Sequence, residues 1–86
     1  MTLFKKIPFK CREKDYETRV LYDDKLINIA VFYSNHPANG FRYQVKVPKY
    51  LDIKKLLEVN VIENLVEAAK NDIIEDRWEK LLKTAT

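Results

Sequence analysis

The sequence predicts an α+β domain: a three- to four-stranded antiparallel sheet in meander order, followed by two or three C-terminal helices packed on one face. Near residue 50 the composition changes. β-branched and aromatic residues alternate with polar ones before it, whereas Leu, Glu, Lys and Ala recur at helical spacing after it. The 86 residues are 47% hydrophobic with a single Gly and three Pro, which favours a compact fold. No repeat or linker divides residues 1–86, so one domain is expected.

Residues 2–11 alternate in hydrophobicity and predict the first strand. One side carries Leu3, Ile7, Phe9 and Cys11, and the other carries Lys6, Pro8 and Lys10. Because Pro8 has no N–H to donate to a neighbouring strand, this strand is expected at an edge of the sheet. Cys11 shares the apolar side, so its thiol is expected to be buried and structural, although Lys10 and Arg12 flank it.

Three more strands are predicted between residues 17 and 47. Strands 17–22 and 26–33 are separated by the polar turn Asp23-Asp24-Lys25, which has the length of a hairpin turn. Strand 26–33 is apolar on both faces, which is typical of a central strand. Residues 41–47 show the clearest alternation. Phe41, Tyr43, Val45 and Val47 are predicted to face the core, and Arg42, Gln44 and Lys46 to face outward.

The segment YSNHPANGF, residues 33–41, contains the chain's single histidine, His36, and its single glycine, Gly40. Asn39-Gly40 favours positive φ, but Pro37 lacks an N–H, so the preceding strand is not expected to reach a two-residue type I′ turn there. We therefore predict a longer hairpin loop over residues 34–40, turned by Asn39 or Gly40. His36 is expected at its exposed tip as an ordinary loop residue, because no Cys, second His or carboxylate cluster completes a metal or catalytic set.

The second half predicts helices with two apolar stripes. Asp52 is expected to cap a short helix over residues 53–59, and two capping-box spacings, Asn60 with Glu63 and Asp72 with Glu75, indicate helix starts. The first stripe consists of Ile62, Leu65, Val66, Ala69 and Ile73. The second stripe consists of Ile74, Trp78, Leu81 and Leu82. At about 100° per residue the two stripes are about 145° apart, so one straight helix would present them to different surfaces.

Two interpretations of the second stripe remain open at this point. The helix could break at Asn71-Asp72 and restart, in which case both stripes belong to the core. Alternatively the helix runs on, and Ile74, Trp78, Leu81 and Leu82 form a candidate protein interface.

Charge is divided unevenly along the chain. Residues 1–49 have ten Lys or Arg and five Asp or Glu, hence a net charge of +5, whereas residues 50–86 have a net charge of −2. Four cations on the outward side of the predicted strands form a candidate basic face, consisting of Lys6, Lys10, Arg42 and Lys46. Such a face could follow nucleic-acid phosphates, or it could be ordinary solvated surface. Phe41 and Tyr43 alternate toward the core, so they are not expected to offer a platform for stacked bases.

No enzyme motif is present in the sequence. A single Gly excludes a Gly-rich phosphate loop, one Cys and one His exclude metal-ligand spacings, and the single Ser lacks a nucleophile-elbow context. We therefore expect no catalysis, no cofactor, no metal and no small-molecule ligand. One cysteine and the lack of a long apolar run predict a cytoplasmic protein with no signal peptide and no membrane partner.

Together these features predict a non-catalytic binding module with an accessory or regulatory role. The expected partner is another protein or a second copy of the chain in a homodimer. Nucleic-acid binding through the basic face is the alternative.

Overall fold

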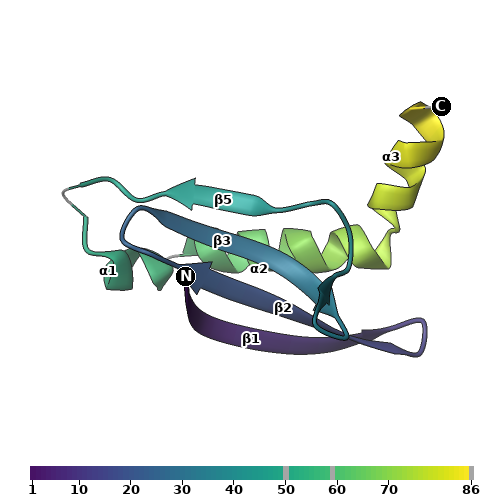
Figure 1. Ribbon diagram of the computed structural model, residues 1–86, viewed down its shortest axis with the longest axis horizontal. Helices are drawn as coiled ribbons and strands as arrows, with labels where there is room; N and C mark the ends of the chain where they lie inside the picture. Colours follow the sequence, from purple (N-terminus) through teal and green to yellow (C-terminus); the bar gives the residue numbers. More distant parts are fainter. Residues whose placement is uncertain (50, 59, 86) are drawn as a thin grey trace.

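The computed structural model describes residues 1–49, 51–58 and 60–85, and within them five antiparallel strands form one sheet. The strands are β1 (Thr2–Cys11), β2 (Lys14–Tyr22), β3 (Leu26–Tyr33), β4 (His36–Pro37) and β5 (Tyr43–Lys46). β1, β2 and β3 follow one another as a meander, and both β4 and β5 pair with β3 (Figure 1). β4 and β5 therefore share one edge of β3, and residues 38–42 connect them.

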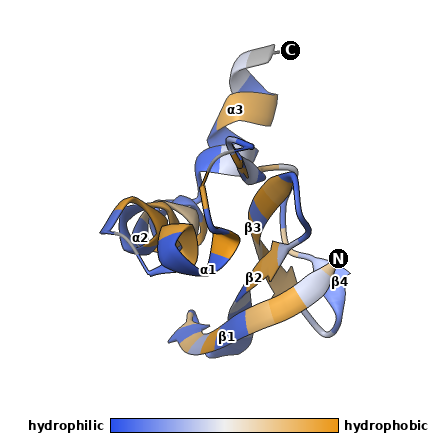
Figure 2. Ribbon diagram, turned by 90° about the vertical axis from the view of Figure 1, so that its left-hand side faces the viewer, coloured by the Kyte–Doolittle hydropathy of each residue, from blue (hydrophilic) through white to orange (hydrophobic). Residues whose placement is uncertain are grey.

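Three helices follow in the described part of the chain: α1 (Ile53–Leu57), α2 (Asn60–Ile74) and α3 (Arg77–Ala85). α1 and α2 lie on one side of the sheet, whereas α3 extends away from the body (Figure 2). The predicted α+β fold is thus confirmed. None of the helices in the described ranges is both long and apolar enough to cross a membrane.

The positions of β1 and β3 in the sheet agree with the sequence pattern. β1 pairs only with β2 among the described strands, so it is an edge strand as Pro8 predicted. A register shift between Leu3 and Lys5 interrupts this edge further. Cys11 is half-buried against the core and forms no disulfide. The centre of the sheet is β3, again as predicted, because β2 lies on one side of it and β4 and β5 on the other.

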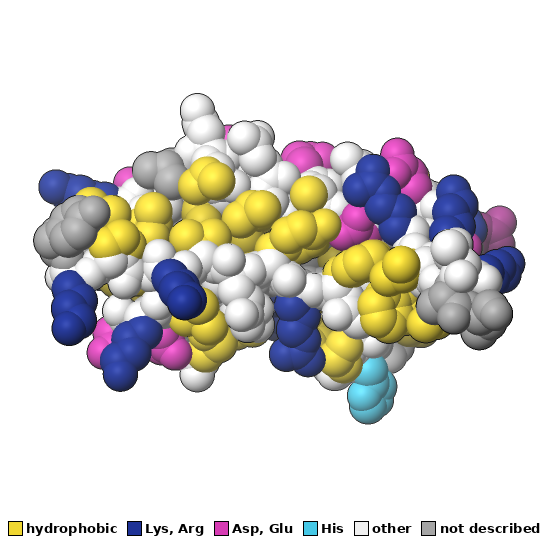
Figure 3. Space-filling view, turned by 90° about the horizontal axis from the view of Figure 1, so that it is seen from above, with side chains coloured by type: hydrophobic (Ala, Val, Ile, Leu, Met, Phe, Trp, Pro, Cys, Tyr) yellow, Lys and Arg dark blue, Asp and Glu magenta, His cyan; other side chains and the backbone are white. Residues whose placement is uncertain are grey.

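The core lies between the sheet and α2. Its buried members are Val20, Ile27, Ile29 and Val31 from the sheet and Leu57, Ile62, Val66, Ala69 and Ile73 from the helices. Each fully buried Val or Ile side chain contributes about 1.5–3 kcal/mol to folding. The predicted first stripe is therefore the core face of α2. The side chains of β5 that point inward, Tyr43 and Val45, are half-buried, and Figure 3 shows hydrophobic side chains running along the length of the face seen from above.

The turn after β3 differs from the prediction. Ser34 and Asn35 have φ angles of 48° and 65°, and Tyr33 pairs directly with His36. This is a two-residue turn with both central residues at positive φ, the geometry that matches the right-handed twist of hairpin strands. The predicted long loop over residues 34–40 is therefore wrong, because the chain turns before Pro37 is reached. His36 is exposed, but it lies in β4 and not at a loop tip.

Two local predictions, the polar turn at residues 23–25 and the Asp52 cap, are confirmed. The Asp23 carboxylate accepts hydrogen bonds of 2.8 Å from the backbone N–H groups of Lys25 and Leu26, which closes the turn between β2 and β3. The Asp52 carboxylate accepts from the N–H of Lys54 at 3.0 Å and caps α1. α1 ends at Leu57, and Val59, the last residue of the predicted helix, lies outside the described residues, as does Tyr50 at the composition change.

Candidate functional site

The candidate site is the junction between α2 and α3, where distant parts of the chain meet. α2 continues to Ile74, and Asp76 reverses the chain at a φ of 58° before α3 begins. The helix therefore breaks about one turn after Asn71-Asp72, the position given in the first interpretation. Asp72 does not start a helix, because its side chain is 3% exposed and is occupied by tertiary hydrogen bonds.

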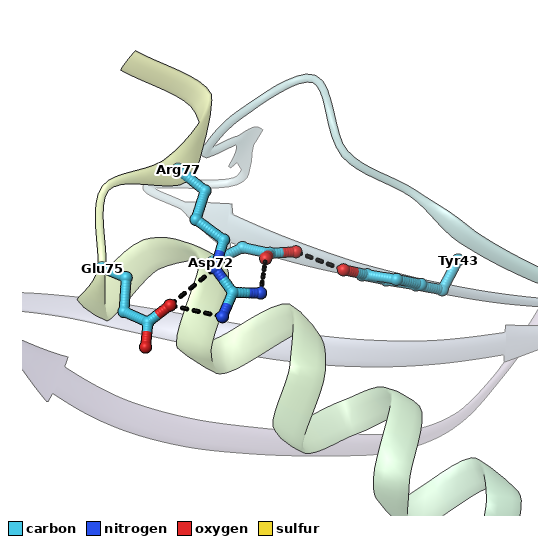
Figure 4. Close-up of polar contacts among 4 residues, drawn as sticks. All are labelled: Tyr43, Asp72, Glu75 and Arg77. Atoms are coloured by element: carbon cyan, nitrogen blue, oxygen red, sulfur yellow. Dashed lines mark hydrogen bonds and ion pairs between the residues drawn. The ribbon is translucent and has the colours of Figure 1, made fainter. Parts of the chain in front are cut away.

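Asp72 joins the sheet to α3 through its two carboxylate oxygens (Figure 4). The Tyr43 hydroxyl on β5 donates to Oδ2, and Nη1 of Arg77, the first residue of α3, donates to Oδ1 at 3.0 Å. Arg77 also donates through Nε to Glu75 at 2.6 Å. A buried carboxylate is costly unless it is paired and hydrogen-bonded, and Asp72 has both kinds of partner.

These contacts change the ionisation of two groups. Burial raises the pKa of Tyr43 to about 12, and the hydrogen bond to Asp72 and the negative charge of that carboxylate act in the same direction. The pKa of Arg77 is also raised, chiefly by its hydrogen bond to Glu75. Tyr43 therefore remains a donor, and Arg77 remains charged, across the neutral pH range.

A second contact fixes α3 against the loop that follows β4. The indole ring of Trp78 lies so close to Gly40 that a Cβ at that position would be 2.7 Å from Trp78 Cζ3 and nearer still to other ring atoms. Trp78 also meets the Phe41 ring edge to face, with centroids 5.2 Å apart. Residues 38–40 do form a bend, and the Asn39 side chain accepts from the N–H of Phe41 at 3.0 Å, but neither Asn39 nor Gly40 has the positive φ that their pairing favours. The role of Gly40 is to leave room for Trp78.

A third contact comes from the turn between β1 and β2. Arg12 donates from Nη2 to the carbonyl of Ile73 at 2.7 Å and from Nη1 to the carbonyl of Ile74 at 3.1 Å. The last carbonyls of a helix lack intrahelical partners and form the negative end of its dipole. Arg12 thus caps the C-terminus of α2, and its guanidinium lies 3.9 Å from the Asp76 carboxylate.

A cleft of about 550 Å³ lies among these segments. Its lining includes Arg12, Lys14, Tyr16, Tyr33, His36 and Trp78. Asp76 and Glu79 line it as well, so cations and carboxylates face the same space and neither sign of ligand charge is favoured. Among the described residues, no group of three or more His, Cys, Asp or Glu side chains is arranged to hold a metal ion.

The predicted interface stripe is divided between the body and the solvent. Trp78 is half-buried, whereas Ile74, Leu81 and Leu82 are 44%, 50% and 46% exposed. The helix does break, as the first interpretation required, but the break does not bring Leu81 and Leu82 into the core. α3 therefore presents an apolar pair outward from a helix that Trp78 and Arg77 attach to the body.

No model of a protein family, no curated protein and no solved structure matches this chain. Function is therefore inferred from the surfaces of the molecule itself.

The predicted basic residues lie on the sheet face opposite α2, but along its two edges. Because Ile7 packs against the core, its neighbour Lys6 points to the outer face. Lys10 lies four residues further along the strand and therefore points to the same face. Lys46 lies on β5, and Arg42 is exposed one residue before that strand. β2 and β3 separate the two pairs by about 14 Å at the usual strand spacing. Between them, the Arg19 guanidinium covers the Phe32 ring at 4.3 Å and forms an ion pair with Glu17.

The sequence patterns did not predict that Arg12, Asp72 and Arg77 connect α3 to the sheet. For Asp72 a signal did exist. Asp72 lies three residues after buried Ala69 and next to buried Ile73, so it is a carboxylate at a core position of the helix. A polar residue at such a position requires a partner.

Proposed function

We propose that this chain is a non-catalytic protein-binding module and that α3 carries its binding surface. The observation that supports this most directly is the exposure of Leu81 and Leu82, at 50% and 46%, on a helix that extends from the body. Adjacent apolar side chains on a short amphipathic helix are the anchors used when a helix binds in a partner's groove.

The attachment of α3 supports the same proposal. Two contacts orient the first turn of the helix: Trp78 packs on Gly40, and Arg77 forms an ion pair with Asp72. The free end of the helix therefore points in one direction. A helix that is already oriented loses less conformational entropy on binding than a flexible tail does. Since Leu81 and Leu82 lie one turn beyond these contacts, the anchors and the exposed pair form one unit.

Nucleic-acid binding by the outer face of the sheet is the second candidate. The exposure of Lys6, Lys10, Arg42 and Lys46 on one side favours it. Two features weaken the positive potential that would attract phosphates. The cations are divided between two edges of the sheet, and Arg19 between them is paired with Glu17. For this reason the protein-binding proposal is preferred.

The proposed compartment is the cytoplasm. The chain has one cysteine, Cys11, which is half-buried among core side chains. The partial burial of Cys11 supports the interpretation that its thiol acts as a small hydrophobic side chain in a reducing compartment, where disulfides are rare.

Site-specific photo-crosslinking tests the proposed surface. A photoreactive amino acid in place of Leu82 is expected to give discrete protein adducts in the cells that make the chain. The same amino acid in place of Leu51, which is similarly exposed at 43%, serves as the matched control. Adducts that are absent at 82, or equal at both positions, would contradict the proposal.

A further inference from the structure

An apolar groove with an acidic rim lies between β1 and the N-terminal half of α2. Its volume is about 530 Å³. The apolar part of its lining consists of Phe4, Ile7, Val20, Leu57, Ile62 and Val66. Three carboxylates, those of Glu58, Glu63 and Glu67, line it as well, against a single cation, Lys5. None of these three carboxylates forms a hydrogen bond or ion pair with another residue in the described part of the chain.

α3 has the complementary character. Its exposed pair, Leu81 and Leu82, is flanked by the cations Lys80 and Lys83, and Glu79 is the single acidic residue within the helix. An apolar stripe bordered by lysines fits an apolar floor bordered by glutamates, because both the buried and the rim contacts are favourable.

The helix cannot reach the groove of its own molecule. α3 begins beyond the C-terminal end of α2, whereas the groove reaches only to Glu67 in the first half of that helix. The rise from Glu67 to Arg77 corresponds to about 15 Å at helical geometry. Trp78 and Arg77 also direct α3 away from the body (Figure 1).

We propose that α3 of one copy binds in the groove between β1 and α2 of a second copy, an inference that rests on the proposed role of α3. Leu81 and Leu82 contact the apolar floor, and Lys80 faces Glu63 and Glu67. Helix and groove are different surfaces, so the contact is heterologous and copies add head to tail. Pairing of two β1 edges is disfavoured by Pro8 and by the register shift near Leu3.

The size of the contact predicts how strong it is. A nine-residue helix in a groove buries an area at the low end of specific interfaces, so association is expected to be weak and to depend on concentration. Because the rim charges are exposed, salt is expected to weaken it further.

Sedimentation velocity of the full chain, from micromolar to millimolar concentration at low and high salt, tests this contact. The average mass of the wild type is expected to rise with concentration, and less so at high salt. Leu82→Asp and Glu67→Lys are each expected to weaken association at least about tenfold, equivalent to about 1.4 kcal/mol. Two surface controls, Leu51→Asp and Asp24→Lys, are expected to associate like the wild type.

Mixing the two variants gives the sharpest result. The Glu67→Lys chain retains an intact α3, and the Leu82→Asp chain retains an intact groove. An equimolar mixture is therefore expected to form a one-to-one dimer that does not grow. As a second surface variant, Lys80→Glu is expected to weaken association, and Lys80→Glu with Glu67→Lys in one chain to restore it.

Other outcomes separate this inference from the proposed function. If Leu82→Asp prevents association but Glu67→Lys associates like the wild type, the groove is wrong while α3 remains a binding surface. A wild type that is monomeric at every concentration, yet gives adducts with another protein through position 82, overturns the second copy as partner. A monomeric wild type with no adduct at position 82 overturns both proposals.

Discussion

The indole ring of Trp78 occupies the space that a side chain at Gly40 would need. The chain's single glycine and single tryptophan are thus in contact, although 37 other residues separate them in the sequence. This contact places the first turn of α3 against the loop between β4 and β5. The orientation of α3 therefore depends on a position where any larger residue would clash.

Gly40→Ala is expected to displace Trp78 and to destabilise the protein by about 1–3 kcal/mol, the usual cost of overpacking. Trp78 fluorescence should shift to longer wavelength as the ring becomes exposed. In a Trp78→Ala background the same Gly40→Ala substitution is expected to cost less than about 0.5 kcal/mol, because the obstructing ring is gone. Denaturant titration of the four proteins measures this coupling, and equal costs in both backgrounds would show that the two residues act independently.

Tyr43 and Asp72 predict how stability changes in alkaline solution. The pKa of Tyr43 is about 12 in the folded protein, compared with an ordinary value of 10.0. A raised pKa means that the folded state holds the phenol proton more tightly than the unfolded chain does. The corresponding stability is complete below pH 10 and is lost as the pH rises through 12.

Tyr43→Phe is therefore expected to reduce stability by about 1–3 kcal/mol at neutral pH, because buried Asp72 loses a donor. Between pH 10 and 12 the difference in free energy of unfolding between wild type and variant should decrease, since the wild type alone loses this contribution. Urea denaturation over a pH series measures both effects. A constant gap across this range would show that the Tyr43 hydroxyl does not hold its proton more tightly in the folded state.

Much of the fold follows from local patterns in the sequence. Alternation in β5 predicted which side chains face the core, and Pro8 predicted an edge strand. The predicted turn at residues 23–25 and the predicted Asp52 cap are also present. In each case the residue that determines the local structure lies within a few positions of that structure in the sequence.

The unpredicted features depend on contacts between distant segments. The end of α2 is set by Arg12, which comes from the turn between β1 and β2, and Asp72 is buried because Tyr43 and Arg77 satisfy it. The turn at Ser34 and Asn35 was missed for a different reason. Neither residue is glycine, whereas Asn39-Gly40 is the pair in this segment whose residue types favour positive φ.

His36 is expected to have no role in stability or metal binding. Its side chain is exposed on β4, and no metal-binding group of His, Cys, Asp or Glu is found in the described ranges of the chain. His36→Ala should change the free energy of unfolding by less than about 0.5 kcal/mol. Zinc should not shift the Tm of either protein. A zinc-dependent increase in Tm that His36→Ala removes would contradict this prediction.

Arg42→Glu combined with Lys46→Glu distinguishes the two candidate functions. If the outer face of the sheet is ordinary solvated surface, this variant should bind nucleic acid no more weakly than Lys54→Glu with Lys55→Glu, which changes the same charge on α1. Filter binding at several salt concentrations makes the comparison. The alternative function requires a selective loss in the Arg42 and Lys46 variant, and a wild-type affinity that falls steeply between about 50 and 200 mM salt.

Trp78 and Leu82 lie on the same helix, but substituting them is expected to affect the stability of α3 differently. Trp78 packs on Gly40 and Phe41, so Trp78→Ala should release α3 from the body. Leu82 is 46% exposed on the free part of α3, so Leu82→Asp should change stability by less than about 0.5 kcal/mol.

Hydrogen exchange at a concentration too low for association separates these effects. In Trp78→Ala the amides of α3 should lose their protection, whereas those in the middle of α2 should keep theirs, because Ile62, Val66 and Ala69 still pack against the sheet. In Leu82→Asp both helices should exchange as in the wild type. Equal loss of protection in the two variants would mean that Leu82 packs on its own molecule and is not available to a partner.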